Sequence, residues 1–317
     1  MIELSHIVKR FGDKLAVDDV SFAVGEGEIV GFLGPNGAGK TTTLSILTGY
    51  LSATSGTAKI GGVDILEHPA EAKRQIGFLP EYAPLYLDMT VEEYLGFVYE
   101  LKGVKLPRAA HLCEIAAVAR VEDVYRRVIK NLSKGYRQRV GIAAALVGNP
   151  KILVFDEPTV GLDPAQIVEI RNLIRTLGRD HTIILSTHIL SEVQAVCDRI
   201  VVIDGGKILA DKSTAEFVEI TQAPTRLNLR IEGEQADVLR FLRSFNGVKS
   251  AEALARAEEG VYTYFVQTAE GKDIRRDLFF ALAEHDFPVL GMEALGMSVE
   301  DIFLRLVGGD DNRKEVR

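Results

Sequence analysis

The sequence predicts an α/β domain followed by a smaller α+β domain, and three observations support this. Over about the first 215 residues, β-branched runs such as "IVGFLG", "KILVFDEP" and "HTIILSTH" alternate with helical patterns. Runs of this kind, bounded by turn residues, are typical of buried parallel strands. A glycine-rich loop follows the first run, and Pro224 interrupts the chain before a second pattern of strands and helices.

The length and hydrophobicity of the chain fit this division. It has 317 residues, of which 47% are hydrophobic, and a chain of this size is expected to form roughly two domains. No run approaches the roughly 20 apolar residues that span a bilayer, and the first residues lack the apolar region of a signal peptide. We therefore expect the chain in the cytoplasm.

Charge and cysteine content exclude several function classes. The net charge of −8 is spread evenly, with −4 in residues 1–219 and −4 in residues 220–317. Neither part has the basic excess that neutralises a phosphate backbone, so we expect no nucleic acid partner. Cys113 and Cys197 lie far apart without metal-ligand spacing, which indicates a reducing compartment and argues against thiol catalysis.

We predict that the first domain covers residues 1–217 and contains an inserted helical subdomain at about 83–130. The insert has few strand-like runs and several helical patterns. One of these begins with "TVEE", where Thr90 and Glu93 fit a capping box. The later segment "RIVVIDGGKILADK" predicts two strands that are joined at its "DGG" turn.

A linker at 218–225 is expected to lead into the second domain, 226–317. In this domain "RLNLRIEG", a helix at about 235–245, "VYTYFVQT" and a helix at about 273–284 form a β-α-β-α pattern of ferredoxin-like size. The amphipathic segment "SVEDIFLRLV" is expected to complete it.

The loop "GPNGAGKT" lies between the apolar run "EIVGFL" and the helical run "TTTLSILTGY". It matches G-x-x-x-x-G-K-[ST] in the strand, loop and helix context of a phosphate-binding loop; the alternative is a plain glycine-rich turn before a helix. Its glycines let consecutive N–H groups face one anion at a helix N-terminus. We expect Lys40 to reach the β- and γ-phosphates, Thr41 to bind Mg²⁺ and Thr42 to add a phosphate hydrogen bond. The loop residues expected to bind nucleotide are Asn36, Gly37, Ala38, Gly39, Lys40, Thr41 and Thr42.

Two acidic residues end the strand-like run "ILVFDE", at the carboxyl edge where ligands bind in an open α/β sheet. We expect Asp156 to hold Mg²⁺ through water and Glu157 to be the general base for the attacking water; a solvated turn is the alternative. His188 ends the next run, "STH". A lone histidine is more often structural, but its place one strand beyond the acids favours a γ-phosphate contact. The predicted catalytic residues are Glu157, His188 and Lys40.

The phosphate loop, "LSKGYRQR", "ILVFDEP", "GLDP" and "STH", in this order, resemble the nucleotide-binding subunit of ATP-binding-cassette (ABC) transporters over about residues 1–215. The resemblance implies a phosphate-loop NTPase fold with a RecA-like α/β core, an antiparallel β subdomain and an inserted helical subdomain. It also implies an ATPase that uses ATP and Mg²⁺ and works as a head-to-tail homodimer. In the family, the signature "LSGGQ" binds the γ-phosphate of nucleotide held by the opposite subunit. Ser133 and Gly135 match these contacts, whereas Lys134 and Tyr136 depart from the second Gly and the Gln.

The resemblance assigns further site residues. Phe11 stands where an aromatic residue of the family stacks on adenine, with Val17 beside it. Stacking is nearly indifferent to the base, so ATP over GTP is implied by the family alone. Glu81, in "FLPE", stands where the Q-loop of the family has glutamine, and its carboxylate can still be an oxygen ligand for Mg²⁺. Asp163, in "GLDP", is expected to join the two sites across the dimer.

Within the family, "LPE", "LSKGYRQR", "GLDPAQIVEIRNLI" and "SVEDIFLRLV" resemble the ABC-2 exporter type, closest to gliding-motility-associated ATPases. This type implies a separate integral membrane permease on which the helical subdomain docks, and therefore a location on the inner face of the cell membrane. The permease would select the cargo. The second domain matches an accessory domain whose ligand the resemblance does not specify.

Two other function classes remain open. One is a soluble ABC ATPase that acts on nucleic acid or ribosomes, although such proteins usually carry a coiled-coil insertion or paired cassettes, and this chain has one cassette and no heptad run. The other is a nucleotide switch whose second domain senses a small molecule.

Overall fold

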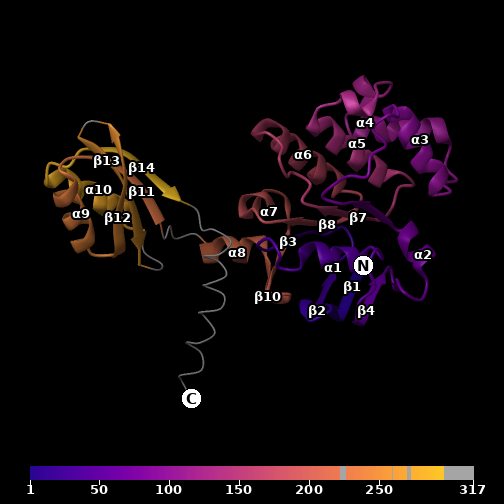
Figure 1. The fold of residues 1–317 in the computed structure, drawn as a ribbon, viewed down its shortest axis with the longest axis horizontal. Coiled ribbons are helices and arrows are strands. Elements are labelled where there is room, and N and C mark those ends of the chain that lie inside the picture. Colours follow the sequence, from indigo (N-terminus) through magenta and orange to yellow (C-terminus); the bar gives the residue numbers. More distant parts are fainter. Residues whose placement is uncertain (222–225, 259, 270–272, 296–317) are drawn as a thin grey trace, which may run out of the picture. The chain divides into compact units, whose positions relative to one another are not determined.

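The computed structural model describes residues 1–221, 226–258, 260–269 and 273–295 (Figure 1). The chain divides into two compact units, Met1–Thr214 and Ala215–Arg317, which are described separately below. The segment predicted as a linker, 218–225, begins within helix α8 (Thr214–Thr221). The predicted closing segment "SVEDIFLRLV" lies outside the described residues.

A six-stranded sheet forms the centre of the first unit, in the order β10-β9-β3-β8-β7-β6. Its strands are β3 (Ile29–Leu33), β6 (Ile76–Leu79), β7 (Ile152–Asp156), β8 (Thr182–Thr187), β9 (Arg199–Asp204) and β10 (Lys207–Ser213). Neighbours from β9 to β6 are parallel, and β10 pairs with β9 in antiparallel fashion through the predicted "DGG" turn. Every residue of β3, β7 and β8 is buried, which explains why these strands are continuous apolar runs.

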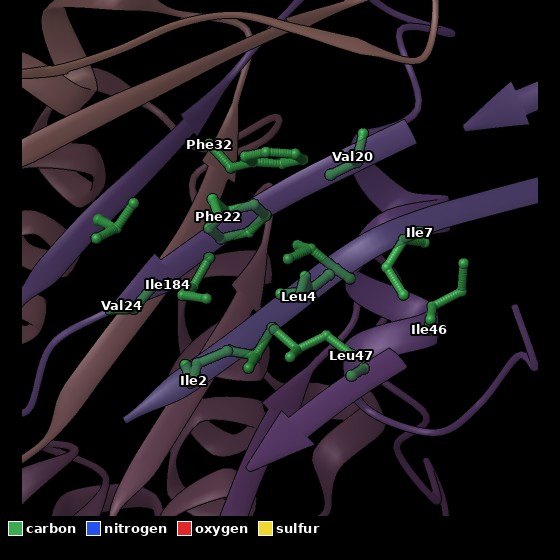
Figure 2. Close-up of a cluster of buried hydrophobic side chains, with 14 of the residues drawn as sticks. Ile2, Leu4, Ile7, Val20, Phe22, Val24, Phe32, Ile46, Leu47 and Ile184 are labelled. Atoms are coloured by element: carbon green, nitrogen blue, oxygen red, sulfur yellow. The ribbon is translucent and has the colours of Figure 1, made fainter. Parts of the chain in front are cut away.

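A second, antiparallel sheet of the same unit has the order β2-β1-β4-β5. Its strands are β1 (Ile2–Phe11), β2 (Lys14–Val24), β4 (Ser55–Ile60) and β5 (Val63–Asp64). Figure 2 shows Leu4 and Phe22 of this sheet near Phe32 of β3 and Leu47 of helix α1 (Lys40–Leu47). The rings of Phe22 and Phe32 stack with centroids 5.5 Å apart. This apolar cluster joins the two sheets and fixes α1 between them.

Helices of the first unit divide into two groups. The helices α2 (Pro69–Arg74), α6 (Pro164–Leu177) and α7 (Leu190–Val196) each connect two consecutive strands of the chain. The helices α3 (Val91–Leu101), α4 (Arg108–Val118) and α5 (Lys134–Leu146), with the short 3-10 helices η1 (Glu122–Val124) and η2 (Ile129–Asn131), lie together on one side of the central sheet, away from β1, β2 and β4 (Figure 1). The predicted capping box is confirmed, because Thr90 and Glu93 satisfy each other's backbone N–H groups at the start of α3.

The second unit contains an antiparallel sheet in the order β12-β13-β11-β14. Its elements are β11 (Arg226–Glu232), α9 (Gln235–Ser244), β12 (Val248–Glu258), β13 (Val261–Thr268), α10 (Arg275–Glu284) and β14 (Val289–Leu295). Numbered within the unit, this β-α-β-β-α-β chain has the strand order of a ferredoxin-like fold. Side chains such as Leu229, Tyr264 and Leu278 form its own buried core. Strands β12 and β14 were absent from the predicted pattern. The sequence of β12, "VKSAEALARAE", is rich in alanine and charged residues, which are depleted in strands.

Among the described residues, no helix combines the length and the apolar character needed to cross a membrane.

Candidate functional site

Four neighbouring strands of the central sheet deliver the candidate site residues to one edge. Strand β3 leads into the phosphate loop, β7 ends at Asp156 before Glu157, β8 ends before His188, and β6 ends two residues before Glu81. These strands are parallel and adjacent in the order β3-β8-β7-β6. Their carboxyl ends therefore meet at the same edge, which is where ligands bind in open α/β sheets.

A cavity of about 440 Å³ lies at this edge. Eight of the predicted phosphate-loop and catalytic residues, with Phe11 and Glu81, line it together with three others. The full lining is Phe11, Lys14, Ala16, Asn36, Gly37, Gly39, Lys40, Thr41, Thr42, Glu81, Glu157, Val160 and His188. Residues far apart in the sequence thus converge on one concave surface.

The loop before α1 is shaped by glycine. Gly39 has a φ of +110°, and a Cβ there would lie 2.8 Å from the carbonyl oxygen of Ala16. Gly39 is also the N-cap of α1 and provides no side-chain hydrogen bond to the first turn. The first-turn N–H groups are therefore not capped by a side chain and are available to an anion. Ala38 is buried and does not line the cavity, although its backbone belongs to the same loop.

Three charged or titratable groups meet beside this loop. Lys40 is 6% exposed, and its Nζ donates to the carbonyl oxygens of Gly34 (2.8 Å) and Pro35 (3.2 Å). The same Nζ lies 3.3 Å from Oε1 of Glu157, and Nδ1 of His188 lies 3.0 Å from Oε2 of Glu157. A buried carboxylate thus lies between a lysine and a histidine.

The backbone of Glu157 is held in a rare conformation. Its φ is +49°, in the left-handed region that side chains other than glycine seldom adopt. Its N–H donates to both the Oγ and the carbonyl oxygen of Ser186. Oε1 of Glu157 is buried without a hydrogen bond. The carboxylate therefore keeps one acceptor oxygen for a further donor inside the cavity, beside the Lys40 ammonium.

Asp156 lies behind the cavity rather than in its lining. It is 1% exposed, and its Oδ1 accepts a hydrogen bond from Ser186 Oγ. Thr41 and Glu81 line the cavity itself. Together the three residues supply a hydroxyl and two carboxylates, which is the oxygen donor set that Mg²⁺ prefers. The residues present therefore fit a bound Mg²⁺.

The aromatic end of the cavity differs in one residue from the prediction. Phe11 lines the cavity with 47% of its surface exposed, and the ammonium of Lys9 lies 5.0 Å from its ring centroid. Val17 instead has no exposed surface and belongs to the apolar core, and Ala16 takes the place beside Phe11. The reason is strand alternation, because neighbouring residues of β2 face opposite sides.

Lys14 and Val160 also line the cavity and were not predicted. Lys14 pairs with Phe11 across the two-residue turn between β1 and β2. The "FGDK" turn was the signal that could have placed Lys14 beside the aromatic residue. Val160 lies three residues after Glu157, and no motif marks it as a cavity residue.

The signature residues and Asp163 do not line this cavity. Ser133 is the N-cap of α5, and its hydroxyl accepts from the N–H of Tyr136 at 3.4 Å. A Cβ on Gly135 would lie 2.6 Å from the end of the Gln166 side chain, so the start of α5 lies close against α6. Asp163 is the N-cap of α6 and accepts from the N–H of Gln166. The two helix starts are therefore packed against each other within one chain.

Both departures from the family signature have partners in this chain. The ammonium of Lys134 lies close against Gly161, because a Cβ built there would be 2.1 Å from its Nζ. The hydroxyl of Tyr136 donates to Oδ2 of Asp123, and the guanidinium of Arg139 lies 5.5 Å from the Tyr136 ring centroid. Both side chains thus make contacts within the chain, while Lys134 stays exposed and Tyr136 half-buried.

Comparison with known proteins agrees with this site. Residues 17–160 match the family model described as ABC transporter. The linearmycin resistance ATP-binding protein LnrL of Bacillus subtilis is 31% identical over 97% of this chain and 98% of its own length. The Nod factor export ATP-binding protein I of Ralstonia nicotianae is 33% identical over 97% of this chain and 94% of its own length.

A solved structure extends the comparison to three dimensions. A dimeric post-hydrolysis state of an ATP-binding cassette bound to ADP and Pi superposes with a TM-score of 0.61 and 26% identity. It covers 68% of this chain and 99% of that cassette. The matched family model, the relatives aligned along nearly the whole chain and the convergent phosphate-loop cavity lead to one conclusion: the chain belongs to the ABC transporter ATP-binding proteins.

Proposed function

We propose that this chain is the ATP-binding and ATP-hydrolysing subunit of an ABC-2 type exporter and acts on a separate membrane permease. The observation that carries the proposal is the cavity in which Lys40, Glu157 and His188 converge on a glycine loop at the ends of parallel strands. Relatives aligned along nearly the whole chain include a Nod factor export protein and an antibiotic resistance protein. In this proposal the permease, and not this chain, selects the cargo.

Each site residue has a separate role in the proposed hydrolysis. The first-turn N–H groups of α1 and the Lys40 ammonium bind the phosphates, since both offer positive charge to an anion. Glu157 accepts the proton of the attacking water, and His188 orients its carboxylate from 3.0 Å. Lys40 lies on the other carboxylate oxygen at 3.3 Å, so phosphate binding by Lys40 also leaves that oxygen free for water.

We propose Thr41, Asp156 and Glu81 as the residues that would hold Mg²⁺. When bound, the metal would neutralise charge on the phosphate oxygens. The replacement of the usual glutamine by Glu81 adds a negative charge to the lining. That charge favours a cation at this position and disfavours nucleotide without one.

Substitution of Glu157 by glutamine tests the catalytic assignment. The amide keeps the size of the side chain but cannot accept the proton, so steady-state ATP turnover should fall by at least about 100-fold. Nucleotide binding, followed by calorimetry or a fluorescent analogue, should persist. Glu67→Gln, which removes an exposed carboxylate remote from the cavity, is the matched control. Turnover that survives in Glu157→Gln would show that another group is the base.

The proposed dimer follows from the separation of the two phosphate-binding helix starts. The start of α5 lies outside the cavity of its own chain, and the related cassette bound to ADP and Pi is dimeric. We propose that two copies pair head to tail, so that Ser133 and Gly135 of each complete the cavity of the other. A two-fold axis makes both composite sites equivalent.

A cleft in the first unit supports docking of the permease. This cleft of about 310 Å³ is lined by β6, the loop that follows it, α3 and α5, and its walls are mostly apolar. Tyr50 on its rim and the neighbouring Tyr82 are 80% and 83% exposed. Exposed aromatic residues beside an apolar cleft are typical of a surface that a partner covers. We propose a cytoplasmic helix of the permease as the occupant, which places the chain on the inner face of the membrane.

Co-purification tests the partner. The tagged chain, extracted with mild detergent from its native membranes, should retain a multispanning protein. Tyr50→Asp with Tyr82→Asp should release that protein while ATP binding stays unchanged, because both tyrosines lie outside the nucleotide cavity. Recovery of nucleic acid or ribosomes in its place would contradict the exporter assignment.

A further inference from the structure

A buried carboxylate outside the nucleotide cavity links the segments that carry the catalytic residues. Glu192 lies in the first turn of α7 and is 4% exposed. The hydroxyl of Thr159 donates to both of its oxygens, at 2.7 Å and 2.8 Å. The hydroxyl of Thr187 donates to Oε2 at 2.8 Å. One side chain thus holds two hydroxyls from different parts of the chain.

Each hydroxyl belongs to a catalytic segment. Thr159 lies two residues after Glu157, and Thr187 directly precedes His188. The carbonyl oxygen of Thr187 also accepts from the N–H of Gly34, the first residue of the phosphate loop. The positions of the base, the histidine and the loop are therefore connected through two threonines to Glu192.

Burial of this carboxylate needs an explanation. An ionised carboxylate in the interior costs free energy unless charge and hydrogen bonds compensate it. Within the described residues, the cation that pairs with this carboxylate is Arg171, whose Nη2 lies 3.8 Å from Oε1, which is longer than a hydrogen bond. The compensation thus comes mainly from the two threonine hydroxyls, so the carboxylate and the two segments constrain one another.

We propose that Glu192 is a positioning residue for ATP hydrolysis, which sets the distance between Glu157 and His188 through Thr159 and Thr187. It does not line the nucleotide cavity and acts through these threonines. The 3.0 Å contact between His188 and Glu157 depends on how the two segments are held together. The inference rests on the proposed role of Glu157 as the base.

The test compares kcat with nucleotide binding in the full chain. Glu192→Gln keeps the shape but removes the negative charge and leaves one neutral acceptor oxygen for both hydroxyls, so the hydrogen bonds that hold Thr159 and Thr187 weaken. We expect kcat to fall about tenfold, with KM and the dissociation constant for ATP within about twofold of the wild type. Ser191→Ala, which changes an exposed neighbour on the same turn, is the control and should keep wild-type turnover.

The hydroxyl of Thr159 provides a second, conservative pair of variants. Thr159→Ser keeps the donor and should keep kcat, whereas Thr159→Val, of similar volume, should lower it as Glu192→Gln does. The double variant Thr159→Val/Glu192→Gln should be no slower than the slower single variant, because both break one linkage. This pair remains informative even where Glu192→Gln does not fold.

Three results would overturn the inference. They are unchanged kcat in Glu192→Gln, equal losses in Thr159→Ser and Thr159→Val, or multiplied losses in the double variant. Glu157→Gln is measured in the same assay. If it turns over ATP normally, the proposed base is wrong; if it is inactive while Glu192→Gln is normal, only the positioning role fails.

Discussion

Helices α1 and α5 both start at segments that suit an anion, but their first turns have different surroundings. The first residue of α1, Lys40, is buried in the nucleotide cavity, and the N-cap Gly39 leaves the turn uncapped. The N-cap of α5, Ser133, is exposed and caps its own helix. The α1 start lies in a cavity of its own chain, whereas the α5 start would meet nucleotide only in the proposed head-to-tail dimer.

The two helix starts also differ in how they are supported. Lys40 contacts Gly34 and Glu157, which directly follow the buried strands β3 and β7. Gly135 and Lys134 at the α5 start rest on Gln166 and Gly161, in and just before α6. The α1 start is thus supported from the central sheet, and the α5 start from the beginning of α6.

The largest effect is expected when each helix start is inactivated in a different chain. Lys40→Ala and Ser133→Arg should each abolish turnover alone. When the two variants are mixed, head-to-tail pairing leaves one intact composite site in each mixed dimer, so ATPase activity should return. The mixed dimers are about half of all dimers if subunits exchange freely. Mixing two preparations of the same variant is the control, and no recovery in the mixture would contradict the head-to-tail arrangement.

A smaller change tests the geometry of the α1 start alone. Gly39→Ala forces a side chain into a φ of +110° and within 2.8 Å of the Ala16 carbonyl oxygen. Strain of about 1–3 kcal/mol should weaken ATP binding by about tenfold or more, measured by titration calorimetry. Gly37→Ala is the matched control, since its φ is +83° but no atom lies within 4 Å of the added methyl. Equal losses in both variants would mean that backbone strain, and not the close approach, decides.

The smallest expected effect concerns the departure at Tyr136. Tyr136→Phe removes the hydrogen bond to Asp123, which should cost less than about 1 kcal/mol of stability at this solvent-accessible site and leave turnover unchanged. That hydrogen bond raises the pKa of Tyr136. The contribution is therefore fully present below the ordinary pKa near 10 and lost as pH rises through the raised value. Chemical denaturation at pH 7 and above pH 10 measures it; a difference that grows with pH would reverse the sign.

Much of the nucleotide half of the site could be predicted from the sequence. The phosphate loop, Glu157 and His188 are tied to strand ends, and strand ends are readable from apolar runs. Periodicity alone could not place Val17, because the side of β2 that faces the cavity depends on the register with β1. Strand β12 was missed for a related reason: its pairing with β13 overrides a local composition that favours helix.

The connections among site residues were beyond prediction. No sequence pattern relates Glu192 to Thr159 and Thr187, and only the packing of α7 beside β8 and the segment after β7 brings the three together. Likewise nothing in "LSKGYRQR" indicates that Lys134 lies against Gly161. Such contacts join segments that lie apart in the sequence, and no sequence pattern relates one segment to the other. The assignment to gliding-motility-associated ATPases stays a prediction.

The left-handed backbone of Glu157 has a consequence for protein engineering. A non-glycine residue at a φ of +49° stores strain, and its buried Oε1 lacks a hydrogen bond. Glycine at this position would relieve both terms, but it would leave the buried Lys40 ammonium without its carboxylate. Laboratory evolution that selects only for heat resistance places no value on this carboxylate, so it retains any replacement of Glu157 that stabilises the chain even where turnover is lost. Selection for thermal tolerance of this protein thus has to be coupled to turnover.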